Sequence, residues 1–244
     1  MSTYFSVITK DFDDDLDAIR LLVQTFDGPR ENAKTRIAAA NSATLLLAAT
    51  FEEFVREMAR AYAKAVVDTT TSFEGLPQKM ANTAWRRTME TLARSRIDNK
   101  IHPNVISEAH ARFNAVYKFC KGDLTQDIYV ELIHNENNMR GKEINSLFTI
   151  SNLKNVCLKI AEKRPLLDNF GEAEAKKTHG RLLESLDEFF ERRNDIAHSL
   201  NATSSSGPSQ ILKDIDMFDA IGKSLCETLE ALAPEPPKPM EEMA

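Results

Sequence analysis

One long segment with the apolar period of an α-helix constrains the fold more than any other feature of the sequence. From about residue 31 to residue 67, apolar side chains recur every three or four positions, at Phe51, Val55, Met58, Tyr62 and Val66. This spacing places them on one stripe of a helix about ten turns long. Such a stripe has to be buried against other elements of the same domain.

The composition indicates that those other elements are helices too. The chain has 244 residues, of which only eight are glycine, and runs of alternating β-branched residues are few. With 42% hydrophobic and 28% charged residues it has the balance of a soluble globular protein. We expect one all-α domain over residues 1–232 and a disordered, proline-rich, acidic tail at residues 233–244.

Apolar periods and helix-ending residues divide the remaining chain into further helices. Gly28 and Pro29 end the first helix, Pro103 suits the first turn of another, and Ser151 is a candidate N-cap. Residues 122–140 are the least regular part and predict a short helix or an extended piece. The expected helices span residues 11–27, 76–97, 102–121, 141–150, 151–163, 172–199 and 211–233, with a flexible connection at residues 201–210.

Several classes of protein are disfavoured by simple counts. The three cysteines are far apart and odd in number, which argues against a disulfide framework or a metal knuckle and favours a reducing cytoplasm. We expect no metal, because no two histidines stand four residues apart with an acidic companion, and no cofactor. We expect no membrane partner, because the longest apolar run, residues 43–51, is too short to span a bilayer and the N-terminus lacks a secretory signal. A net charge of −6 argues against indiscriminate nucleic-acid binding but leaves room for a local cationic pocket.

The segment ERRNDIAHSL, residues 191–200, places an arginine on the apolar face at the end of a helix. On a wheel of about 100° per residue starting at Leu182, Arg193 lies at about 20°, inside an apolar arc of about 140° formed by Leu186, Phe189, Phe190, Ile196 and Ala197. Asn194 and His198 lie at the edge of the arc, four residues apart. A desolvated arginine without a partner costs several kcal/mol, so Arg193 requires an anion, either a carboxylate of the fold or a phosphate of a substrate.

Glu52 is the better candidate for a carboxylate partner. In ATFEEFVREMA it lies on the margin of the apolar arc of its helix, whereas Glu53 points well away from that arc. The alternative is that both glutamates belong to a solvated face.

Arginine, asparagine and histidine together point to one chemistry in particular. The sequence has no glycine-rich phosphate loop, no serine elbow and no cysteine beside a base. His198 can take the proton of an RNA 2′-hydroxyl, and Arg193 can stabilise the charge that builds on the phosphate. Residues five apart diverge by about 140° on an ideal helix, so convergence requires the reach of arginine, a loosened last turn or a second copy of the chain.

These residues resemble a known family. RNDIAH, from Arg193 to His198, is similar to the R-x4-H motif of HEPN domains, in which a polar residue, commonly Asn, follows the arginine. AATFEEFVREMA resembles an early helix of HEPN branches found beside prokaryotic defence and toxin genes. HNENNMRGKEINSLF, residues 134–148, resembles a central segment of the RiboL-PSP type of that family.

The resemblance implies a helical bundle and a homodimer in which two motifs form one composite cleft. It also implies a metal-independent endoribonuclease that leaves a 2′,3′-cyclic phosphate and acts as a toxin or antiviral defence effector, with an antitoxin or defence-system partner. Arg193 and His198 would be catalytic, Asn194 would orient or bind, and Glu52 would support them. Leu200 stands where some HEPN toxins carry a modified tyrosine, which argues against control by that route. The alternative is a noncatalytic HEPN module that binds a nucleotide or a protein.

Two further segments carry polar side chains that suit RNA. WRRTMETLARSRIDNK, residues 85–100, combines Trp85 with Arg86, Arg87, Arg94, Arg96 and Lys100, a set that can guide an RNA backbone or can be an ordinary solvated helix face. The amides and Arg140 of HNENNMR can line the cleft or can belong to an asparagine-rich turn.

Overall fold

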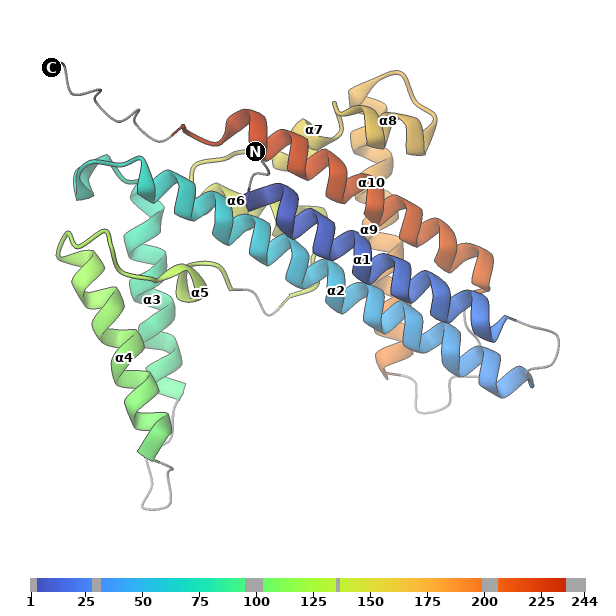
Figure 1. The fold of residues 1–244 in the computed structure, drawn as a ribbon, viewed down its shortest axis with the longest axis horizontal. Helices are drawn as coiled ribbons and strands as arrows, with labels where there is room; N and C mark the ends of the chain where they lie inside the picture. The colour runs from blue at the N-terminus through green and yellow to red at the C-terminus, as the bar shows by residue number, and fades with distance from the viewer. Residues whose placement is uncertain (1–3, 28–31, 95–102, 135–136, 199–205, 236–244) are drawn as a thin grey trace, which may run out of the picture. The chain divides into compact units, whose positions relative to one another are not determined.

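A computed structural model describes residues 4–27, 32–94, 103–134, 137–198 and 206–235. Within these ranges the chain is helical and contains no β-strand, which confirms the predicted all-α class (Figure 1). The elements are α1 (Tyr4–Phe26), α2 (Ala33–Asp68), a short 3-10 turn η1 (Phe73–Gly75), α3 (Gln78–Arg94), α4 (Pro103–Cys120), α5 (Tyr129–Leu132), α6 (Gly141–Ile150), α7 (Val156–Ile160), α8 (Arg164–Phe170), α9 (Ala175–His198) and α10 (Pro208–Leu232).

The chain divides into two compact units. The first comprises residues 1–58, 136–145 and 155–232, and the second comprises residues 59–135, 146–154 and 233–244. The long helix α2 contributes its first part to the first unit and its remainder to the second. That residues 1–232 behave as one domain stays a prediction.

Phenylalanines from four helices build the core of the first unit. Phe12 of α1 stacks on Phe54 of α2 with ring centroids 4.1 Å apart, and Phe218 of α10 lies 4.3 Å from Phe51 of α2 and 4.8 Å from Phe189 of α9. These contacts bury the apolar stripes that the sequence predicted for α1, α2, α9 and α10. They also fix the position of α9, which carries the candidate motif.

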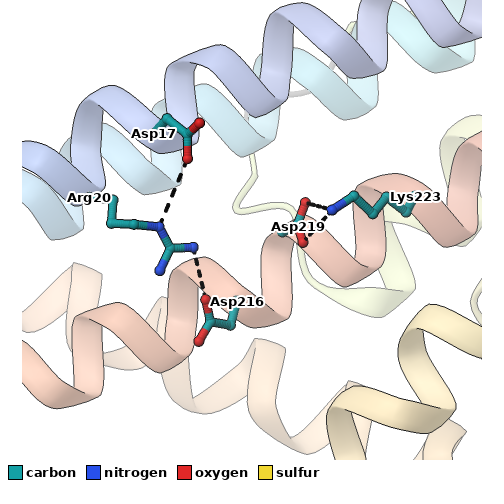
Figure 2. Close-up of polar contacts among 5 residues, drawn as sticks. All are labelled: Asp17, Arg20, Asp216, Asp219 and Lys223. Carbon is teal, nitrogen blue, oxygen red and sulfur yellow. Dashed lines mark hydrogen bonds and ion pairs between the residues drawn. The ribbon is translucent and has the colours of Figure 1, made fainter.

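Helices α1 and α10 pack closely along their lengths. At Gly222 of α10, a Cβ atom would lie 3.1 Å from the Phe12 ring, so a larger side chain there would force that ring to move. Charged residues line the edge of this contact (Figure 2): Arg20 donates to Asp216 at 2.8 Å and lies 3.9 Å from Asp17, and Lys223 binds Asp219. One ion pair between the helices and one within each helix therefore flank an apolar core.

In the second unit, α4 and α5 both pack on α3. Phe73 and Phe119 meet edge to face with centroids 6.2 Å apart, and Tyr62 of α2 meets Phe148 of α6 in the same way at 6.3 Å. The Arg87 guanidinium donates to the main-chain carbonyl of Leu132 and joins α3 to α5. The described residues of the irregular region predicted at 122–140 include one short helix, α5.

Three sequence expectations were wrong in detail. α1 begins at Tyr4 rather than near residue 11, because Phe5 and Thr9 continue the buried face and the Thr9 hydroxyl donates to the Phe5 carbonyl. Ser151 is not an N-cap: it is buried in the turn after α6, and α7 begins at Val156 after the left-handed residue Asn155. Residues 164–170 form a further helix, α8, which the sequence did not predict, with Pro165 in its first turn.

The other boundaries lie close to those expected. α6 spans the predicted residues 141–150, and α9 begins at Ala175, three residues after the predicted start. Several predicted features lie outside the described residues: Gly28 and Pro29, the end of the 76–97 helix with Arg96 and Lys100, His102, most of the 201–210 connection and most of the tail. None of the helices described here has the uninterrupted apolar length that crossing a membrane requires.

Candidate functional site at the end of helix α9

The burial of the α9 side chains decreases toward the C-terminal end of the helix. Leu182, Leu186, Phe189 and Phe190 are fully buried, as the wheel predicted. In the last two turns, Arg193, Asn194 and Ile196 are only partly buried and Ala197 and His198 are exposed. The expectation that Ile196 and Ala197 belong to the packed face was therefore wrong, because no neighbouring element covers them fully in the described part of the first unit.

The first of the two adjacent arginines is neutralised by the fold itself. Nη2 of Arg192 lies 2.8 Å from both carboxylate oxygens of Asp214 on α10, and its Cζ lies 5.8 Å from the centroid of the Phe189 ring. Asp214 is 5% exposed and also accepts a hydrogen bond from Gln210 at 3.0 Å. Burial raises the pKa of Asp214, and the charge of Arg192 partly opposes this effect.

Sequence reasoning missed this pair, although one signal was present. Asp214 stands among Ile211, Ile215 and Phe218, on the apolar face of its helix. A carboxylate on such a face requires a cation for the same reason that Arg193 requires an anion.

Arg193 is placed differently. Its Nη1 donates to the amide oxygen of its neighbour Asn194 at 3.3 Å, and its Nε is buried without a hydrogen-bond partner among the described residues. The Nε of Arg192 is likewise buried and unpartnered, but Arg192 has a carboxylate in direct contact. Arg193 thus keeps donor capacity and charge that the described residues do not fully use.

Glu52 supplies negative charge near Arg193 without forming the tight pair that Asp214 forms. Burial raises the pKa of Glu52, while the charges of Arg193 and Arg56 and a hydrogen bond from the Met139 N–H partly lower it. Glu52 is partly buried, as its position on the wheel predicted, and Glu53 is exposed and binds Arg56 at 2.7 Å. The role of Glu52 in a site stays a prediction.

Residues 138–141 link α2 to α9 at this point. Asn138 donates through Nδ2 to the Asn194 amide oxygen at 3.0 Å, and Arg140 binds Asp187 of α9 at 3.3 Å. Gly141 packs so tightly on α9 that a Cβ atom there would lie 2.2 Å from Leu183. The sequence suggested that amides of this segment line the site, and the structure places one of them on Asn194.

His198 is the last residue of α9 and is exposed. The helix keeps its α-helical form up to this residue, so no loosened turn brings His198 toward Arg193. Because Arg193 and His198 are five residues apart in a regular α-helix, their side chains point in directions about 140° apart. The structure therefore brings Arg193, Asn194, Asn138 and Glu52 together, whereas the His198 side chain points in another direction at the same end of the helix.

The described residues do not form a metal-binding site. Among the residues that the structure describes, no group of three His, Cys, Asp or Glu side chains is placed to hold a metal ion. The three cysteines are free thiols, and burial raises the pKa of Cys157 to about 12.

Comparison with known proteins adds one match. A sequence model of the RiboL-PSP-HEPN family matches residues 10–231, from α1 to the end of α10. None of the curated proteins and none of the solved structures gives a match. The match covers most of the chain and includes both the R-x4-H segment and the segment around Asn138, so this all-α chain belongs to the RiboL-PSP-HEPN family.

Proposed function

We propose that the chain is a metal-independent endoribonuclease that acts as a toxin or antiviral defence effector. Membership of the HEPN family supports a role that involves RNA or nucleotides. The finer proposal depends on the residues at the end of α9, and on one contrast in particular.

That contrast is between Arg192 and Arg193. The fold supplies Arg192 with a carboxylate in direct contact, whereas Arg193, also partly buried, receives from the described residues only an amide oxygen and the nearby charge of Glu52. An arginine without a direct counter-ion suits a phosphate, which accepts charge-assisted hydrogen bonds from a guanidinium. This contrast supports Arg193 as the group that binds the scissile phosphate.

The chemistry requires two proton transfers. The imidazole of His198 accepts the proton of the 2′-hydroxyl, and the 2′-oxygen attacks the adjacent phosphorus. Arg193 stabilises the charge on the non-bridging oxygens while the bond from phosphorus to the 5′-oxygen breaks. A second imidazole protonates the departing 5′-oxygen, so the products are a 2′,3′-cyclic phosphate and a 5′-hydroxyl.

A second copy of the chain supplies the second imidazole. Because α9 stays helical to its last residue, Arg193 and His198 of one chain diverge, and a two-fold axis near the end of α9 allows each motif to complete the other. The proposal therefore includes a homodimer with a composite site. The antitoxin or defence-system partner expected from the sequence stays part of the same proposal.

The test of catalysis uses purified protein and RNA in excess chelator. We expect cleavage that yields 2′,3′-cyclic phosphate ends, and loss of cleavage in His198→Ala but not in His179→Ala, a change on the same helix outside the motif. Expression in bacteria should slow growth for the wild type and not for His198→Ala. Loss of cleavage in chelator, or full cleavage by His198→Ala, would contradict the proposal, and inert, harmless wild-type protein would favour a noncatalytic binding module.

The test of the composite site uses mixed dimers. Co-expression of His198→Ala with wild type should depress activity beyond simple dilution, because each mixed dimer lacks one imidazole at a shared site. Light scattering that reports a monomer at working concentration would rule out this arrangement.

A further inference from the structure

A second surface of the chain exposes aromatic side chains on α3 and α4. Trp85 is 37% exposed and Tyr117 is 44% exposed, and Phe113 lies between them. The Phe113 ring centroid is 6.0 Å from that of Trp85 and 6.1 Å from that of Tyr117, and the planes of Phe113 and Tyr117 differ by 22°. The three rings thus form a continuous aromatic row within the second unit.

The row borders a shallow hollow of about 380 Å³. Its lining includes Phe73, Asn82, Trp85, Tyr117 and Lys121. Aromatic rings can hold a flat ring, and an amide and an ammonium group can hydrogen-bond its edge. The lining of the hollow therefore suits a planar, partly polar ligand.

The hollow carries positive charge in a chain whose net charge is −6. Lys121 lines it, and Arg86 and Lys118 directly follow Trp85 and Tyr117 in the sequence. The exposed pair of Arg86 with Glu90 at 2.8 Å is of a kind that contributes little, so Arg86 can exchange its partner for a phosphate.

We propose that this aromatic surface, formed by Trp85, Phe113, Tyr117, Asn82 and Lys121, binds single-stranded RNA. Bases stack on Trp85 and Tyr117, and Lys121 with the neighbouring cations holds the phosphates. The proposal goes beyond cleavage, because binding here uses neither Arg193 nor His198. It selects RNA that is unpaired, since a base inside a duplex presents no free face.

The positive charge of this surface favours RNA over a second copy of the chain as its partner. A second copy of the chain would bring the same cations to the surface, and the two sets would repel each other. A nucleic acid brings phosphates that match the cations and bases that match the rings.

The only tryptophan of the chain reports on this surface directly. Wild-type protein is titrated with a short single-stranded 2′-O-methyl oligonucleotide, which cannot be cleaved by 2′-hydroxyl attack, while Trp85 fluorescence is recorded. We expect saturable quenching that weakens as salt rises. Inorganic polyphosphate, which carries charge without bases, should leave the fluorescence unchanged.

Substitutions then test the stacking. Tyr117→Ala should weaken binding about tenfold or more, and Trp85→Ala should do the same with a labelled oligonucleotide, whereas Trp85→Phe retains most of the affinity. Tyr4→Ala is the matched control, because Tyr4 is 64% exposed on α1. Because the oligonucleotide resists cleavage, binding here and catalysis by His198 succeed or fail independently.

Three outcomes would overturn this inference. The first is equal quenching by polyphosphate, and the second is unchanged affinity in both Tyr117→Ala and Trp85→Ala. The third is an absence of quenching together with a dimer that dissociates in Trp85→Ala, which would make the surface a contact between copies.

Discussion

The cations at the contact between α1 and α10 are paired with carboxylates, whereas Arg193 at the end of α9 has no carboxylate in direct contact among the described residues. Between α1 and α10, Arg20 binds Asp216 across the helices and Lys223 binds Asp219 along α10 (Figure 2), and Phe12 and Phe218 are buried. At the end of α9, Arg193 is partly buried with an unpartnered Nε, beside amides that come from two parts of the chain. The first region satisfies its own charges, whereas the second leaves capacity for a ligand.

The difference shows which polar residues serve the fold. Exposed ion pairs such as those of Figure 2 contribute about 0–1 kcal/mol each, so the apolar contacts of Phe12 and Phe218 hold α1 and α10 in place. A partly buried arginine such as Arg193, which has no carboxylate in direct contact among the described residues, does not stabilise the fold through an ion pair. Its presence is better explained by what it binds.

The largest expected effect separates the two arginines by activity. Arg193→Met should lower RNA cleavage about 100- to 1,000-fold, because a cation that stabilises the phosphoryl charge is removed. The protein should stay folded, since no direct ion pair of the described residues is broken. Cleavage rates and thermal melting of the same preparation test both statements. If Arg193→Met cleaves RNA as fast as the wild type, the proposed difference between Arg192 and Arg193 is wrong.

The next effect concerns stability. Arg192→Met should lower the free energy of unfolding by about 3 kcal/mol, because Asp214, 5% exposed, loses its cation. Arg192→Met combined with Asp214→Leu should recover much of this loss, since no unpaired charge remains. Denaturant unfolding of the single and double variants measures the coupling, and additive losses would show that the pair is not a unit.

A smaller effect is expected at Asn138. Asn138→Ala removes the hydrogen bond that holds the Asn194 amide, worth about 1 kcal/mol, and should lower cleavage roughly three- to tenfold. Asn138→Asp should be worse, because a carboxylate cannot donate to the Asn194 oxygen. Lys142→Ala, an exposed change in the same segment, is the control, and equal loss in both variants would point to the segment as a whole rather than to the hydrogen bond.

The smallest effect belongs to the α1–α10 region. Burial and the charge of Asp219 raise the pKa of Asp13, and the charge of Lys223 partly opposes them. A carboxyl whose pKa is raised by folding costs stability once pH exceeds that pKa, and the cost vanishes below its unfolded pKa. Asp13→Asn should therefore raise the melting temperature slightly at pH 7 and leave it unchanged near pH 3, and thermal melting at both pH values tests this.

Much of the fold was predictable because it depends on local period. The repeat of apolar residues predicted α2, the limits of α6 and the helix that ends in His198, and it placed Glu52 at a margin and Glu53 in solvent. α7 and α8 escaped prediction because they are short and are set by turns, including the left-handed Asn155. Helices as short as α7 and α8 contain too few apolar residues to show a detectable repeat.

The sequence by itself determined the all-α class, the principal helices and the Arg193, Asn194 and His198 segment, since each follows from neighbours along the chain. Only the tertiary structure decided which arginine finds a carboxylate, because Asp214 reaches Arg192 from another helix. It also decided that Asn138 holds Asn194 across 56 positions and that Ile196 and Ala197 stay partly or fully exposed. A helical period marks a face, but which neighbour covers that face, and how far, is a property of packing.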